Sequence, residues 1–274
     1  MSSLPYELIA LDLDLTFLDD AHQISPRNRA AVLRCAEMGA KVVLSSGRMY
    51  RCTLPYLHLL GLDAPLITYN GAFIKQESTG EVWLDEHLDL GVAREIVDFC
   101  AARDLNLNYY LDDNLYVAKI NPWAELYSAR TTAPLNPVGD LRTLTDRAPT
   151  KVLIVADPGC IAELYVEMSA TYGDRAYVTI SNVEYLEFMP KGVDKGKALH
   201  AVADHCGIPH AKTIAFGDAG NDIPLIRAAG LGVAMENAKP EAKAVAGRIA
   251  PPYDEDGVAA VLEELFGFTP ASAG

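Results

Sequence analysis

Short apolar runs alternate with stretches of helical periodicity near both ends of the chain, and this alternation limits the possible folds more than any other feature. An apolar run at 6–15 precedes a helical stretch that has Ser25 as its predicted N-cap and stops at Gly39, and a second apolar run follows at 41–46. The same alternation resumes at 195–235. Parallel strands joined by crossover helices produce this pattern. The sequence therefore predicts an α/β fold built on a doubly wound parallel sheet.

The middle of the chain follows a different pattern. Turn residues at Gly80 and Asp112 separate β-prone stretches, as in hairpins, and the segment between them has the periodicity of an amphipathic helix. Hairpins and helices of this kind suit an open antiparallel sheet. We expect an inserted α+β domain at 84–188 within a core domain formed by residues 1–83 and 189–274, because a sheet interrupted between two strands can still close.

The composition argues against several classes of partner. The 274 residues include 37 acidic and 23 basic ones, and the formal net charge of −14 repels nucleic acids and anionic membranes on average. The five cysteines form no CxxC pair, so we expect reduced thiols and neither a disulfide framework nor a thiolate zinc site. The first residues lack a basic leader, and nowhere do about 18 apolar residues run together. We therefore expect a cytoplasmic protein, and the sequence does not indicate its oligomeric state.

Carboxylates gather where the predicted strands end. In an open parallel sheet the carboxyl ends of the strands share one edge, and ligands bind there. Four acids within about 5 Å of one another would repel by roughly 3 kcal/mol per ionised pair at an effective dielectric constant of about 20. A divalent cation would remove this cost, and an all-oxygen donor set favours Mg²⁺, whereas no histidine pair has the spacing of a zinc site. The acids are Asp12, Asp14, Asp218 and Asp222.

The same edge offers groups that could catalyse phosphoryl transfer. A carboxylate beside Mg²⁺ can attack a bound phosphoryl group and form an aspartyl-phosphate. The transition state spreads negative charge over the phosphoryl oxygens, which then need hydroxyl, backbone N–H and ammonium donors. Thr16, Ser46 and Gly47 follow strand ends and can supply the first two kinds of donor. The candidates for the ammonium group are Lys195, at the predicted start of a helix, and its neighbours Lys191 and Lys197.

Six short motifs recur together in an order that resembles one protein family. They are "LDLDLTFLDD", "VVLSSGR", "YNGAFI", "GVDKGKAL", "GDAGNDIPLI" and the C-terminal stretch that starts with "GVAMENAKPEAKAVA". In order and spacing they resemble the haloacid dehalogenase-like phosphatases, specifically the Cof-type branch with a large α/β cap. The resemblance covers nearly the whole chain. It implies a phosphatase in which the inserted domain is a mobile cap that closes over the substrate and determines specificity.

The resemblance also implies a role for each motif residue. Asp12 corresponds to the nucleophile, and Asp14, two positions further on and expected on the same strand face, corresponds to the general acid and base. Mg²⁺ would be held by the carboxylate of Asp12, the backbone carbonyl of Asp14 and Asp218. Asp222 would orient Lys195 or a water molecule on the metal. The implied phosphate-binding groups are the backbone at Leu13, Thr16, Ser46, Gly47, Lys195 and Asn221.

Two positions depart from the pattern of the family. Leu15 stands between the acid/base residue and Thr16, where glycine is usual, and its β-carbon could narrow the turn or shift the backbone. Ser46 replaces the commoner threonine and lacks only a methyl group. Two further residues follow strand ends, and the sequence leaves their roles open. Arg48 could contact substrate or form a structural ion pair, and Asn70 could be a turn residue or a ligand contact.

Together these observations predict a Mg²⁺-dependent hydrolase of small phosphorylated metabolites, such as sugar phosphates or phosphorylated cofactors. One alternative is a sugar phosphomutase, in which the same aspartyl-phosphate passes its group to another hydroxyl. A second alternative is a receiver-like signalling domain that carries a phosphoaspartate as a switch. Asp14 argues against the switch, because a positioned acid and base would speed dephosphorylation.

Overall fold

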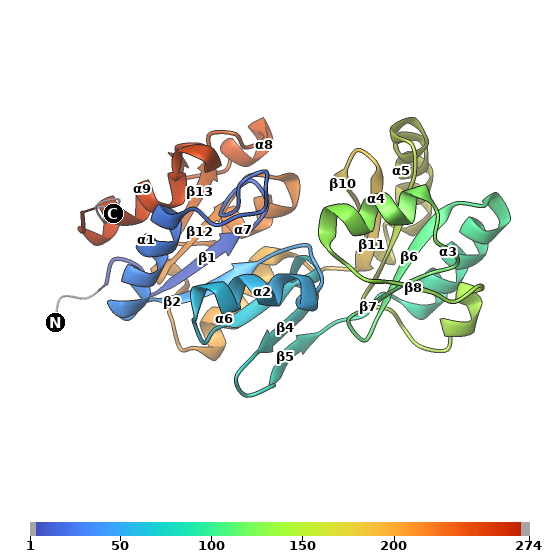
Figure 1. Cartoon of the computed structure of the whole chain (residues 1–274), viewed down its shortest axis with the longest axis horizontal. Helices are drawn as coiled ribbons and strands as arrows, with labels where there is room; N and C mark the ends of the chain where they lie inside the picture. The colour runs from blue at the N-terminus through green and yellow to red at the C-terminus, as the bar shows by residue number, and fades with distance from the viewer. Residues whose placement is uncertain (1–3, 270–274) are drawn as a thin grey trace. The chain divides into compact units, whose positions relative to one another are not determined.

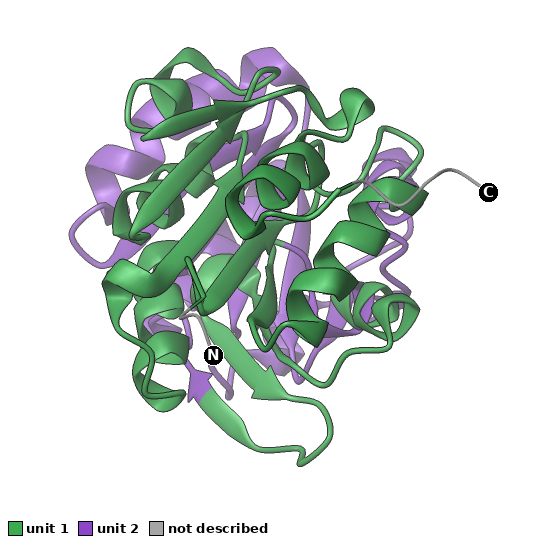
Figure 2. Ribbon diagram, turned by 90° about the vertical axis from the view of Figure 1, so that its left-hand side faces the viewer, with its two compact units in different colours: residues 1–47, 53–83, 194–274 green, residues 48–52, 84–193 purple. Residues whose placement is uncertain are grey.

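The chain folds into two compact units, which Figure 2 draws in different colours. The structure, a computed structural model, describes residues 4–269. One unit comprises 1–47, 53–83 and 194–274, and the other comprises 48–52 and 84–193. The longer segment of the second unit, 84–193, begins where the inserted domain was expected and extends five residues beyond the expected end at 188.

The short segment 48–52 groups with the second unit, which the sequence did not indicate. The amides of Tyr50 and Arg51 donate hydrogen bonds to the two carboxylate oxygens of Asp113, at 3.0 and 2.9 Å. Asp113 has a positive φ of 54° and lies in the turn between two strands of that unit. These contacts pair residues more than 60 positions apart, which no local pattern can reveal.

The first unit is built on an eight-stranded sheet with the order β14-β13-β12-β1-β2-β3-β4-β5 (Figure 1). Neighbouring strands from β14 to β3 run parallel, and β3 pairs with β4 antiparallel. This confirms the predicted α/β fold with a parallel sheet. Its strands are β1 (Leu8–Asp12), β2 (Lys41–Ser45), β3 (Pro65–Thr68), β4 (Phe73–Gln76), β5 (Val82–Asp85), β12 (Thr213–Gly217), β13 (Leu231–Met235) and β14 (Arg248–Ala250).

The helices of this sheet follow their strands in the expected order. They are α1 (Pro26–Glu37), α2 (Tyr50–Leu60), α6 (Lys195–His205), α7 (Ile223–Ala228), α8 (Pro240–Lys243) and α9 (Gly257–Phe266), with short 3₁₀ helices at η1 (Tyr69–Gly71), η3 (His210–Lys212), η4 (Gly220–Asp222) and η5 (Tyr253–Glu255). The predicted N-cap is confirmed, since the Ser25 side chain accepts a hydrogen bond from the Asn28 amide. Gly39, with φ of 106°, follows the end of α1 in a conformation that favours glycine.

Strand β1 is shorter than the apolar run predicts. All five of its residues are buried, but the strand ends at Asp12. The amides of Thr16, Phe17 and Leu18 then all donate to the carbonyl of Leu13, at 3.3, 3.0 and 2.8 Å, which closes a tight turn. The prediction that Asp14 continues the strand and shares its face with Asp12 was therefore wrong. The pattern was misleading because Leu13, Phe17 and Leu18, which follow the strand, are as buried and apolar as the strand residues.

The second unit contains a six-stranded sheet with the order β10-β11-β9-β6-β7-β8. The pairs are antiparallel except for β7 and β8, which run parallel. Its strands are β6 (Asn106–Leu111), β7 (Asn114–Val117), β8 (Leu135–Pro137), β9 (Lys151–Val155), β10 (Ala176–Asn182) and β11 (Tyr185–Pro190). Its helices are α3 (Leu90–Arg103), α4 (Pro122–Thr131), α5 (Pro158–Tyr172) and the 3₁₀ helix η2 (Leu141–Leu144).

The two faces of this second sheet differ in character. One face packs against α3 and α5 through buried apolar side chains such as Ile96, Ile161 and Phe188. On the other face, Lys151 and Glu187 form a buried ion pair with 3.0 Å between Nζ and Oε2. In residues 4–269, no helix combines the length and the apolar composition that a membrane span needs.

Candidate active site

The register of the parallel strands places the predicted site residues at one edge of the first sheet. Asp12 pairs with Ser45 of β2, and Leu11 pairs with Phe216 of β12. The residues that follow these strands therefore emerge beside Asp12, as expected for the carboxyl edge of a parallel sheet. The first unit alone supplies every side chain of the site described below.

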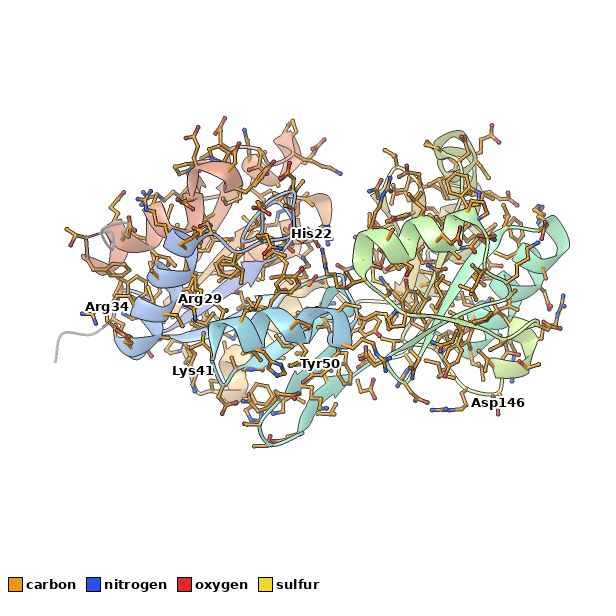
Figure 3. All side chains as sticks on the ribbon, viewed as in Figure 1. His22, Arg29, Arg34, Lys41, Tyr50 and Asp146 are labelled. Atoms are coloured by element: carbon orange, nitrogen blue, oxygen red, sulfur yellow. The ribbon has the colours of Figure 1, made fainter. Side chains whose placement is uncertain are left out.

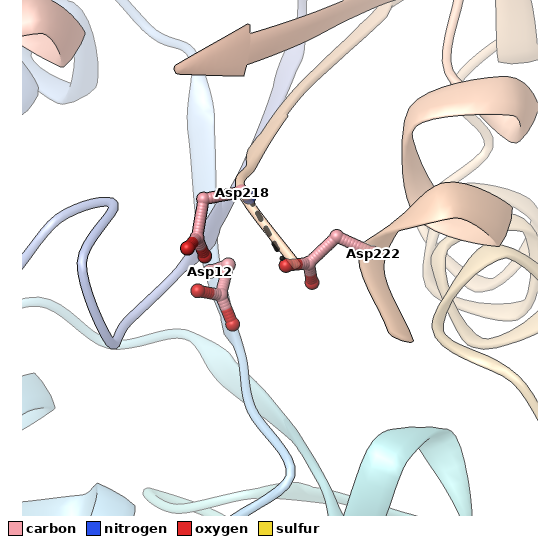
Figure 4. A group of neighbouring side chains, drawn as sticks. All are labelled: Asp12, Asp218 and Asp222. Carbon is pink, nitrogen blue, oxygen red and sulfur yellow. Dashed lines mark hydrogen bonds between the residues drawn. The ribbon is translucent and has the colours of Figure 1, made fainter. Parts of the chain in front are cut away.

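Three carboxylates lie close together at this edge. Oxygen atoms of Asp12, Asp218 and Asp222 lie within 4.8 Å of one another, and Figure 4 shows the three side chains facing a common space. Asp12 and Asp222 are buried. The hydroxyl of Thr16, which is also buried, donates to Oδ1 of Asp218 at 3.2 Å and so connects the turn after β1 to the segment after β12.

Lys195 is the lysine that the structure brings to these acids. It is the first residue of α6, whose N-cap Asp194 accepts a hydrogen bond from the Lys197 amide at 2.8 Å. Its Nζ lies 2.6 Å from Oδ1 of Asp12 and 2.6 Å from Oδ1 of Asp222. The alternative lysines are more than half exposed, and Lys191 donates instead to the carbonyl of Asp174.

Asp222 uses its second oxygen to fix the backbone. Its Oδ2 accepts from the amides of Asp218 and Ala219, at 3.2 and 3.0 Å, and the first of these bonds is drawn in Figure 4. A β-carbon on Gly217 would lie 2.4 Å from the β-carbon of Asp222, so only glycine permits this approach. With both oxygens engaged, Asp222 holds Lys195 and the Asp218 backbone in place.

Burial raises the proton affinity of the cluster. The pKa of Asp12 lies well above its ordinary value because the carboxyl is buried and faces Asp222, and the nearby Lys195 offsets this only in part. Burial, followed by the charge of Asp222, raises the pKa of Asp218 to about 7. The cluster has more negative than positive groups, since one lysine faces three carboxylates. An all-oxygen donor set with this deficit fits a hard divalent cation such as Mg²⁺.

The predicted phosphate-binding residues after β2 and β12 meet at Asn70. The Asn70 amide donates to the carbonyl of Ser46 at 3.0 Å, and its Oδ1 accepts from Nδ2 of Asn221 at 2.8 Å. A β-carbon on Gly47 would lie 2.9 Å from the same Oδ1. The sequence left open whether Asn70 is a turn residue or a ligand contact, because the turn motif "NG" carries no information about its distant partners.

Leu15 occupies the turn in a left-handed conformation, with φ of 57°. Its side chain is 40% exposed, whereas its neighbours Leu13 and Thr16 are fully buried. The Leu15 carbonyl accepts from Nδ2 of Asn237 at 2.9 Å, and Oδ1 of Asn237 accepts from the Tyr253 amide at 3.2 Å. The turn is therefore formed with leucine at this position, in spite of the left-handed conformation.

Asp14 is set apart from the buried acids. Its side chain is 46% exposed, and Oδ1 lies 3.4 Å from Nδ1 of His22, the histidine labelled in Figure 3. His22 follows Asp14 in the loop between β1 and α1 and has a positive φ of 57°. No sequence pattern indicated that these two residues pair, since they are eight positions apart in an irregular segment. Solvent therefore reaches this carboxyl, unlike the buried carboxyls of Asp12 and Asp222.

Buried acids and a lysine gather at the carboxyl edge of a parallel sheet, which is where such folds bind their ligands. A sequence model described as haloacid dehalogenase-like hydrolase matches residues 9–262. The chain therefore belongs to this family, as the motifs indicated.

Relatives of known name agree with this assignment. The chain is 32% identical to 5-amino-6-(5-phospho-D-ribitylamino)uracil phosphatase YitU of Bacillus subtilis, over 97% of this chain and 99% of that protein. It is also 32% identical to the HMP-PP phosphatase of Cronobacter sakazakii, over 85% of each chain. A crystal structure of a haloacid dehalogenase-like hydrolase from Bacteroides thetaiotaomicron matches with a TM-score of 0.88 and 29% identity, over 95% of this chain and 100% of that one. The chain is a phosphatase that acts on phosphomonoesters.

Proposed function

We propose that Asp12 is the nucleophile of this phosphatase and Asp14 its general acid and base. An Asp12 oxygen attacks phosphorus, the bond between phosphorus and the ester oxygen breaks, and Asp14 gives its proton to the leaving oxygen. Asp14 then takes a proton from a water molecule that attacks the aspartyl-phosphate, which releases phosphate and restores Asp12. The observation that carries this proposal is the buried contact of Asp12 with Lys195, and the half-exposed Asp14 lies two positions further along the chain.

The remaining residues bind and neutralise the phosphoryl group. Lys195 supplies positive charge next to the attacking oxygen, and Asp222 holds its ammonium group there. The implied phosphate donors are the hydroxyls of Thr16 and Ser46, the backbone at Leu13 and Gly47, and the amide of Asn221.

The acid cluster fits Mg²⁺, and Asp12, the Asp14 carbonyl and Asp218 are the groups that would hold it. When bound, the ion supplies the positive charge that offsets the buried carboxylates and stabilises negative charge on the phosphoryl oxygens. Thr16 would orient Asp218 for this task through its hydrogen bond to Oδ1.

The substrate is a small phosphorylated metabolite. The names of two relatives refer to a phosphorylated ribitylaminouracil and to HMP-PP, so both relatives act on phosphorylated metabolites. We propose that the unit formed mainly by 84–193 acts as a cap that selects among such leaving groups.

A panel of phosphomonoesters tests this function. Sugar phosphates, a phosphorylated ribitylaminouracil and HMP-PP are incubated with the protein, with Mg²⁺ or with EDTA, and released phosphate is measured. We expect activity that EDTA abolishes, a loss of roughly 10³-fold or more in Asp12→Asn, and little change in Asp20→Asn, an exposed acid of the same loop. Full activity in EDTA or in Asp12→Asn would refute the proposed chemistry, and an isomerised sugar phosphate without free phosphate would indicate a mutase.

A further inference from the structure

Asn70 lies in a segment whose backbone is strained. Tyr69 and Asn70 are consecutive residues with positive φ, 52° and 55°, and both are buried. Residues other than glycine adopt this left-handed backbone conformation at a cost in free energy, although asparagine does so more readily than most residues. Strain of this kind persists where the surrounding contacts hold the residue in place, and it often occurs at functional sites.

The contacts of Asn70 join two segments that are far apart in the sequence. Its backbone amide holds the carbonyl of Ser46, directly before Gly47, and its side-chain oxygen holds the amide of Asn221. Asn70 and Asn221 are 151 positions apart. The glycine at position 47 leaves room for the Asn70 side chain, because a β-carbon there would meet Oδ1 at 2.9 Å. Asn70 thus connects the ends of β2, β3 and β12.

A turn residue alone would not need these side-chain contacts. Glycine supplies the left-handed conformation without strain, so the turn by itself does not require a side-chain contact with a residue 151 positions away. The Asn221 amide group carries two hydrogens. Because Asn70 accepts one of them, Asn221 is held in a single orientation and its second hydrogen remains for another acceptor.

We infer that Asn70 is a positioning residue that arranges Asn221 and the Ser46–Gly47 backbone into one phosphate-binding set. This inference rests on the proposed function, in which those residues bind the phosphoryl group. Asn70 itself acts through Asn221 and Gly47. Donors that are already oriented bind an anion without reorganising, so loss of Asn70 weakens phosphate binding although the donors remain.

Inorganic phosphate is the probe for this role. Its inhibition constant as a product inhibitor is measured in the Mg²⁺-loaded protein for the wild type, Asn70→Gly, Asn221→Ala and the double variant, together with KM and kcat for one phosphomonoester. We expect Asn70→Gly to raise the phosphate inhibition constant and KM about tenfold, with a smaller effect on kcat. The double variant should bind phosphate about as well as Asn221→Ala alone, because the two residues act as one unit.

A matched variant and a stability measurement separate this role from a structural one. Asp104→Gly makes the same kind of change at another residue with positive φ, the C-cap of α3, and should leave phosphate inhibition unchanged. Thermal unfolding of each variant shows whether the fold is retained. Asn221→Ala removes the same hydrogen bond from the other side and leaves the residue at position 70 unchanged.

The outcomes are distinguishable. Phosphate inhibition in Asn70→Gly equal to that of the wild type, or losses that simply add in the double variant, would overturn the role of Asn70 and leave the proposed function standing. A wild-type protein that neither hydrolyses the ester nor binds phosphate would overturn the proposed function itself.

Discussion

The Nζ atom of Lys195 donates a hydrogen bond to Oδ1 of Asp12 at 2.6 Å, although 183 positions separate the two residues. Both side chains are buried. Burial lowers the pKa of Lys195, but the carboxylates of Asp12 and Asp222 outweigh this effect, and the pKa lies above its ordinary value. The lysine therefore stays charged, and it is the positive charge that allows two buried carboxylates to lie side by side.

Replacing this lysine should damage both activity and stability. Lys195→Met leaves Asp12 and Asp222 buried without their common cation, and removing one partner of a buried ion pair costs about 3 kcal/mol or more. We expect a loss of at least about 100-fold in kcat/KM, together with a lower midpoint of urea unfolding. Lys197→Met changes an exposed lysine two positions along the same helix and should alter neither quantity appreciably. Wild-type activity in Lys195→Met would show that this contact is not part of the catalytic site.

The pKa of Asp218 predicts how Mg²⁺ binding depends on pH. Burial and Asp222 raise this pKa from 3.8 to about 7, so the folded metal-free protein holds a proton that the unfolded chain releases at lower pH. The metal-free protein should therefore lose stability as the pH rises from about 4 to about 7. Mg²⁺ competes with that proton, so its stabilising effect should grow over the same interval. Thermal unfolding in EDTA and in Mg²⁺ at several pH values measures both trends, and a stabilisation by Mg²⁺ that does not vary with pH would contradict them.

The sequence predicted the fold and the residues that gather at the sheet edge. It did not predict the backbone conformation of the turn after β1. Apolar runs and crossover helices indicate a parallel sheet because burial imposes those patterns on the chain. Once the sheet is known, its carboxyl edge brings Asp12 and Asp218 together. The end of β1 was misplaced, because Leu13 and Phe17 are buried in a turn and have the same apolar character as strand residues.

Other features depend on partners that a single sequence does not reveal. The turn motif at Asn70 is visible in the sequence, but its bond to Asn221 depends on how strands β3 and β12 are placed in the sheet. The contact between Asp14 and His22 depends on the path of an irregular loop. At such positions a local conformation is combined with a distant contact. The local conformation leaves a recognisable pattern in the sequence, and the distant contact does not.

Leu15 offers a test of strain in the catalytic turn. A left-handed conformation costs leucine roughly 1 kcal/mol, and asparagine adopts it more readily. Leu15→Asn should therefore raise the free energy of unfolding by about 0.5 to 1 kcal/mol, since Leu15 is 40% exposed and Asn237 can still bind the carbonyl. Leu59→Asn changes an exposed leucine within helix α2, where asparagine has the lower helix propensity, and should be neutral or slightly destabilising. A lower stability of Leu15→Asn would mean that the leucine side chain makes contacts that outweigh the strain.

The ion pair in the second sheet should behave as a coupled unit. Lys151 and Glu187 are almost fully buried, and Nζ of Lys151 also lies 5.0 Å from the ring centroid of Tyr110. Lys151→Met alone should cost about 3 kcal/mol, because Glu187 would keep a buried charge without its lysine partner. The double variant Lys151→Met with Glu187→Leu should cost much less than the sum of the single variants, because it removes both charges and keeps similar volumes. Urea unfolding of the four proteins measures this coupling. Strictly additive effects would mean that the pair contributes little and that each side chain acts through other neighbours.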